Sequence, residues 1–173
     1  ARAVTPNALR MYGRASDPFV RDTYTALDVL RDSMPFLRED LPIRYDMFGR
    51  LMYLEQYNKQ GLANDVLEVV GSITREYSIK DDPFAKELVK LEYAHSRPAR
   101  KMSLQGFDGT RVELSLQQYS ILEGYTGAQF HHYGLELIQT EAYKRALPYE
   151  KKKMINDIKK AASAYGKAMV LDS

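Results

Sequence analysis

Apolar residues recur with helical spacing most clearly near the C-terminal end of the chain. Proline at Pro148 suits the first turn of a helix, where no amide donor is needed, and a periodic segment runs from there to Val170. One face of this segment is apolar and the opposite face is basic. The apolar face holds Met154, Ile155, Ile158, Ala161, Ala162, Tyr165 and Met169, and the basic face holds Lys152, Lys153, Lys159, Lys160 and Lys167. The pattern predicts a long helix that packs on another element.

A second helical region precedes it and begins at a readable start signal. Ser115 and Gln118 fit the S-x-x-Q capping box, so we expect a helix to begin there. Gly124 and Gly127 permit a break, with a second helix over residues 128–138 and one or two further turns over residues 141–147. Asp108-Gly109 lies between two short extended runs, which predicts a β-hairpin around residues 101–114.

The N-terminal half shows shorter periodic segments. Asp17-Pro18 resembles a helix cap followed by a first-turn proline, and this predicts a helix over roughly residues 18–33. Its common face would hold Val20, Tyr24, Leu27 and either Leu30 or Arg31. Asp82-Pro83 repeats the signal and predicts a helix to about His95, and residues 63–77 carry helical spacing despite a glycine. Residues 41–50 lack such spacing and read as an ordered loop. The expected fold class is mainly α, a multi-helix domain with one short hairpin.

Composition narrows the class of protein. The chain has 173 residues, 45% hydrophobic and 28% charged, which favours one globular domain over residues 1–173. Because the first residue is Ala1, we expect a segment of a longer polypeptide, although removal of an initiator methionine is equally compatible. No apolar run reaches the roughly 18 residues of a membrane span. The absence of cysteine excludes disulfides and thiolate metal sites.

Catalytic and metal-binding patterns are weak. His132 and Glu136 are spaced one helical turn apart, but a catalytic zinc site needs three protein ligands and no motif nominates a third. No stretch fits the nucleophile elbow, the P-loop or the dinucleotide-binding pattern. We therefore expect neither an enzyme nor a bound cofactor or metal.

The basic face of the C-terminal helix could touch the phosphates of DNA. A solvated helix surface explains it more simply, because the same helix also carries Glu150 and Asp157 and the net charge of the chain is only +2. DNA remains a possible partner in this interpretation, with Lys152, Lys153, Lys159, Lys160 and Lys167 as the contacts.

Two pairs of motifs resemble a known family. Residues 17–24 and 41–50 resemble an "R-D-T" segment followed by "L-P-x-R-x-D-x-F/W-G-R". Residues 112–119 and 147–152 resemble "V-x-L-T-x-x-Q-Y" and "L-P-x-E-x-K", with Ser115 at a position that is often threonine. Together they are similar to a large polyvalent protein-associated domain found near the C-terminal end of very long phage and mobile-element proteins.

The resemblance implies a location and a class of partner. It implies a structural module of a bacteriophage internal virion, or DNA-ejection, protein, carried in the virion and delivered into the bacterial host. Such a module docks to copies of itself or to portal, tail or ejection proteins, and the family has no catalytic residues to carry over. Our candidate contact is the loop that holds Leu41, Ile43, Arg44, Tyr45, Met47, Phe48 and Arg50. If Met47 and Phe48 are buried within the chain, this loop is core instead.

Two alternatives remain open at this point. One is a DNA-binding module that uses the lysines of the C-terminal helix, and it predicts binding that weakens strongly with added salt. The other is an accessory domain of a larger enzyme, which predicts no activity for this chain alone.

Overall fold

The computed structural model describes residues 17–23, 25–32, 34–53, 82–94, 103–105 and 109–171. The described part of the chain is mainly helical, which confirms the predicted fold class. Its elements, in chain order, are α2 (Ala26–Asp32), α3 (Pro35–Arg38), α6 (Pro83–Lys90), β1 (Ser103–Gln105), β2 (Arg111–Glu113), α7 (Leu116–Leu137), α8 (Glu141–Arg145) and α9 (Pro148–Leu171). The predicted helix over residues 63–77 lies outside the described residues.

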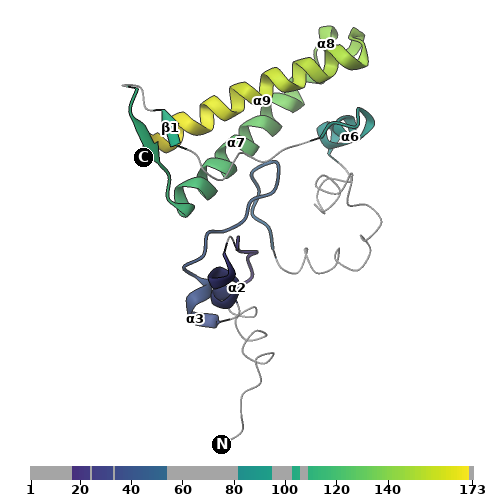
Figure 1. Ribbon diagram of the computed structural model, residues 1–173. Coiled ribbons are helices and arrows are strands. Elements are labelled where there is room, and N and C mark those ends of the chain that lie inside the picture. The colour runs from purple at the N-terminus through teal and green to yellow at the C-terminus, as the bar shows by residue number, and fades with distance from the viewer. Residues whose placement is uncertain are drawn as a thin grey trace, which may run out of the picture.

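The two longest helices, α7 and α9, lie side by side and run in opposite directions (Figure 1). Leu122 packs with Val170 at one end of the pair, and Thr126 faces Gly166 one turn further along. The capping box at Ser115 is confirmed: its hydroxyl accepts from the amide of Gln118 at 3.2 Å, and the Gln118 side chain accepts from the amide of Ser115 at 2.9 Å. α9 spans the whole of the segment predicted for it and ends one residue later, at Leu171. Ile155 and Ala162 are buried on its predicted apolar face, whereas Ala161 and Tyr165 are exposed.

α7 is a single unbroken helix, so the predicted break near Gly124 and Gly127 is wrong. Both glycines are buried against residues 45–49. They are needed for close packing rather than for a change of chain direction.

α6 begins as predicted and ends earlier than predicted. Asp82 caps it by accepting from the amide of Ala85 at 2.9 Å. The helix stops at Lys90, because Glu92 takes a left-handed conformation at φ +50° and the amide of Tyr93 bonds back to the carbonyl of Leu88 at 2.9 Å. This is the hydrogen-bond pattern of a Schellman ending, here without glycine.

The predicted hairpin around residues 101–114 is present as a two-stranded antiparallel sheet. Leu104 pairs with Val112 at its centre, and Gly109 in the connection has φ +83°. That left-handed conformation is one that glycine adopts without strain.

The predicted helix over residues 18–33 is wrong in its first half. Phe19 bridges Tyr53 and Arg21 bridges Ile43, so this segment is extended and pairs with the chain around residues 43–53. α2 starts only at Ala26, and its start is capped by two hydrogen bonds: the Thr25 amide donates to the Asp28 carboxylate, and the Asp28 amide donates to the Thr25 hydroxyl. Pairing with a distant segment overrode the local helix signal.

The main core lies where α6, α7 and α9 meet the tip of the loop at residues 45–50. Its largest members include Phe48, Phe84, Phe130, Tyr143 and Ile155. Phe84 contacts Phe130 edge to face, with ring centroids 5.1 Å apart. The core therefore joins the hairpin at residues 45–50 to helices α6, α7 and α9.

Candidate docking site

The predicted contact loop, residues 41–50, is a small hairpin organised by Asp46. One carboxylate oxygen of Asp46 accepts from the amides of Phe48 and Arg50, each at 2.8 Å, and the other accepts from the Arg50 guanidinium at 2.7 Å. Gly49 has φ +71°, a left-handed conformation that closes the turn. The D-x-F-G-R motif is thus a self-contained turn that points Phe48 away from the hairpin.

The tip of this hairpin is buried against α7. A Cβ atom built on Gly127 would collide with the backbone amide of Gly49 and would lie 2.9 Å from the Gly49 Cα atom. The Tyr45 ring lies over Gly124, and Ser120 donates to the carbonyl of Ile43. The hairpin and helix backbones are therefore in direct contact.

Phe48 fills the space between α6 and α7. Its ring stacks on His131 with centroids 4.3 Å apart and lies 6.0 Å from the ring of Phe84. His131 in turn bonds the carboxylate of Asp82, the cap of α6, at 2.5 Å. One side chain of the hairpin thus packs on both helices at the point where they are tied together.

The hypothesis that this loop docks a partner through its large apolar residues is wrong. Phe48 is 1% exposed and Met47 is 8% exposed, and Leu41 is also buried. Ile43, Arg44, Tyr45 and Arg50 are half-buried at the same junction. The loop belongs to the core of this chain.

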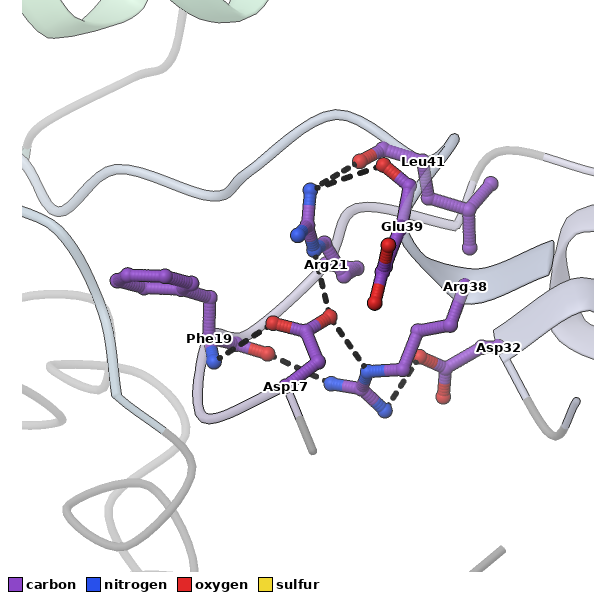
Figure 2. Close-up of polar contacts among 7 residues, drawn as sticks. All are labelled: Asp17, Phe19, Arg21, Asp32, Arg38, Glu39 and Leu41. Carbon is purple, nitrogen blue, oxygen red and sulfur yellow. Dashed lines mark hydrogen bonds and ion pairs between the residues drawn. The ribbon is translucent and has the colours of Figure 1, made fainter. Parts of the chain in front are cut away.

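A buried ion-pair cluster fixes the segment that precedes α2 (Figure 2). Arg38, 1% exposed, donates to Asp17 at 3.0 Å and to the carbonyl of Phe19 at 2.6 Å, and it pairs with Asp32 at 2.9 Å. Arg21 donates to Asp17 at 2.9 Å and to the carbonyl of Leu41 at 2.7 Å. Asp17, predicted as a helix cap, therefore serves as the acceptor at the centre of the cluster.

The charge on Asp17 is stabilised by its donors. Burial raises the pKa of Asp17, but hydrogen bonds from Arg21, the Phe19 amide and Arg38 outweigh burial and hold that pKa below its usual value. Both arginines pair with carboxylates of the cluster, and we interpret the cluster as a structural support for the short helices beside it.

Those helices carry several exposed large apolar side chains. The side chain that α2 buries is an acid, Asp28, while its leucines and valine face outward. Five large apolar residues between 42% and 58% exposed make up what we call the α2–α3 patch: Leu27, Val29, Leu30, Met34 and Leu37. Clustered exposed apolar side chains are a feature of interaction sites, so we take this patch as the candidate docking site. The sequence pattern placed Leu27 and Leu30 on a buried face, because it assumed one longer helix.

The five lysines that the sequence pattern placed on the basic face of α9 differ in their exposure to solvent. Lys153, Lys160 and Lys167 are exposed and recur every seven residues, and Lys152 is also exposed. Lys159 is half-buried, and burial lowers its pKa. Lys160 pairs with Asp157 at 3.6 Å. The basic surface is therefore narrower than the sequence pattern predicted.

The described residues contain no group of three or more histidine, aspartate or glutamate side chains placed to hold a metal ion. His132 and Glu136 lie on the surface with 3.5 Å between the His132 Nε2 and Glu136 Oε1 atoms. Among the described helices none is long and apolar enough to cross a membrane.

Comparison of the chain with models of protein families, with curated proteins and with solved structures finds no match. The α2–α3 patch is therefore proposed as the candidate site on its geometry alone.

Proposed function

We propose that this chain is a structural and interaction module of a bacteriophage internal virion protein, which docks to copies of itself or to portal, tail or ejection proteins. The observation that carries the docking role is the α2–α3 patch. A helix that buries an aspartate and exposes Leu27, Val29 and Leu30 gains free energy when an apolar partner covers it.

The virion setting comes from the motif resemblance. The residues of that motif have physical roles in the fold: Asp46 and Arg50 build the hairpin turn, Gly49 allows its close approach to α7, and Arg21 supports the cluster around Asp17. These roles explain why the motif combines a turn with charged residues. They support a folded, non-catalytic module whose partners bind elsewhere on its surface.

Light scattering tests the docking role. The purified chain is measured at low and high salt, with and without double-stranded DNA. Self-association that persists at high salt, ignores DNA and is lost in a Leu27→Asp variant supports the proposal, because apolar contacts resist salt screening. A monomer that gains mass only with DNA at low salt overturns it.

The second candidate function is DNA binding, which the exposed row of Lys153, Lys160 and Lys167 favours. Phosphate contacts release counterions, so this function predicts a steep fall in affinity as salt rises. Anisotropy of labelled DNA against salt concentration, with a Lys153→Gln and Lys160→Gln double variant, separates it from the docking role.

Antibody labelling tests the virion setting. An antibody against the chain should label particles purified from the host that carries the gene, and the label should fall after the particles release their DNA. Labelling that is confined to uninfected cell extract contradicts the setting without bearing on the patch.

A further inference from the structure

A second apolar surface lies at the corner between α8 and α9. Leu147 is 57% exposed and Tyr149 is 68% exposed, and they are flanked by the exposed residues Lys144, Arg145, Lys152 and Lys153. We call these six residues the α8–α9 corner. Lys144 and Arg145 both pair with Glu141, so the excess positive charge of the corner comes mainly from Lys152 and Lys153. Two neighbouring apolar side chains beside an excess of basic groups suit an apolar partner with an acidic rim.

The α2–α3 patch has the opposite charge. Residues 25–41 contain four acids and two arginines, whereas residues 141–153 contain five basic residues and two acids. Arg38 and Asp28 are buried, and Asp32 pairs with Arg38. The exposed charges are those of Glu39, Asp40 and Arg31, so the exposed rim keeps a net negative charge. The rim of the patch is therefore acidic where the rim of the corner is basic.

The two surfaces lie at opposite ends of the described structure (Figure 1). α2 and α3 lie at one end, and α8 with the start of α9 lies at the other. One copy thus presents an acidic apolar surface at one end and a basic apolar surface at the other, which is the arrangement of a heterologous contact between identical chains.

We propose that copies of this chain associate head to tail, with the α2–α3 patch of one copy docked on the α8–α9 corner of the next. This proposal deepens the proposed function, on which it rests, and names a second copy as the partner. An acidic rim disfavours DNA and anionic lipid as occupants of the patch, because both carry negative phosphates. A heterologous contact of this kind closes into a ring or grows as a filament.

Three aspartate substitutions in the first turns of helices test the contact. Leu27→Asp removes the patch, Tyr149→Asp removes the corner, and Leu116→Asp is the matched control at an exposed leucine outside both surfaces. An acid in the first turn favours the helix, so all three variants are expected to fold, which circular dichroism verifies.

Light scattering of each variant alone and of mixtures gives the readout. Leu27→Asp and Tyr149→Asp should each weaken self-association by on the order of tenfold or more, and Leu116→Asp should behave as the wild type. An equimolar mixture of Leu27→Asp and Tyr149→Asp should form a one-to-one pair and nothing larger, because each supplies the surface that the other lacks.

Four results overturn the head-to-tail contact. A wild-type chain that remains monomeric at high concentration removes it, as does an equal loss in the Leu116→Asp control. Self-association that survives in Tyr149→Asp but not in Leu27→Asp also removes it, and then the patch meets another patch while the proposed docking function stands. A gain of mass with DNA alone removes the proposed function as well.

Charge reversal provides an independent arm. Glu39→Lys with Asp40→Lys should weaken self-association, and adding Lys152→Glu and Lys153→Glu to the same chain should restore it, because each reversed patch then meets a reversed corner. If the chain with both reversals associates no better than the chain with one reversal, the rims do not meet.

Discussion

The contact between the hairpin tip and α7 predicts that Gly127→Ala destabilises the fold, although alanine is the better helix former. Alanine favours a helix interior over glycine by about 1 kcal/mol, so an isolated α7 would gain stability. In this fold the new methyl group meets the Gly49 backbone and lies 2.9 Å from the Phe48 carbonyl carbon. Backbone atoms on a closed turn have little room to yield.

The size of the effect follows from the two ways in which the clash can resolve. Strain in a packed core costs about 1–3 kcal/mol if the tip stays in place. If the tip leaves, Phe48 loses its burial, which costs about 1.5–3 kcal/mol. After the helix gain is subtracted, we expect Gly127→Ala to lower the free energy of unfolding by about 1 kcal/mol, and by no more than about 2 kcal/mol, which corresponds to a fall of up to roughly 1 M in the urea midpoint.

Urea denaturation followed by circular dichroism measures the loss. Ala164→Gly, on the exposed face of α9, calibrates the helix term in the opposite direction. Gly124→Ala is the graded control, because its Cβ meets only the Tyr45 ring, at 3.1 Å, and a side chain can yield. Limited trypsin digestion at Arg50 reports whether the tip has left α7. A Gly127→Ala chain as stable as the wild type, or more stable, refutes the packing argument.

Three further changes have defined outcomes. Because the pKa of Asp17 is lowered from 3.8, the stabilisation by its charge is complete above that pH and is lost as the pH falls through the folded pKa. Between pH 4 and lower pH, the urea midpoint should therefore fall less in Asp17→Asn than in the wild type. Ser115→Ala removes half of the capping box and should cost about 1 kcal/mol in thermal or urea unfolding. Burial and the adjacent Glu87 raise the pKa of Tyr143, so the contribution of its neutral hydroxyl to stability is complete below pH 10 and is lost as the pH rises through the folded value. Tyr143→Phe should remove one phenolate from the absorbance that develops at 295 nm above pH 10. Each contact is contradicted by a different result. The Asp17 ion pairs are contradicted if Asp17→Asn loses stability in acid in parallel with the wild type. The capping box is contradicted if Ser115→Ala leaves the unfolding midpoint unchanged, and the burial of the Tyr143 hydroxyl is contradicted if Tyr143→Phe leaves the titration unchanged.

The patterns that proved reliable are local ones. The helices that start at Pro83, Leu116 and Pro148 have caps or first-turn prolines whose partners lie within four residues, so their starts could be read directly from the sequence. The hairpin at residues 101–114 was equally local, because Asp108-Gly109 signals the turn.

The failures arose where a distant segment decided the structure. Asp17-Pro18 is as good a local helix signal as Asp82-Pro83, yet Phe19 and Arg21 pair with Tyr53 and Ile43. Glycines at 124 and 127 weaken a helix locally, yet α7 continues because the hairpin tip packs on them. In each case a contact between residues far apart in sequence outweighed a propensity of about 1 kcal/mol.

The candidate site shows the same division. The sequence by itself determined that the chain is mainly helical, where its long helices begin and that one face of α9 is basic, because these depend on neighbouring residues. The tertiary structure alone decided that Met47 and Phe48 are core while Leu27 and Leu30 are surface. Hydrophobicity tells which side chains seek burial, but the packing of distant segments determines which of them obtain it, and the remainder form the surface that a partner can cover.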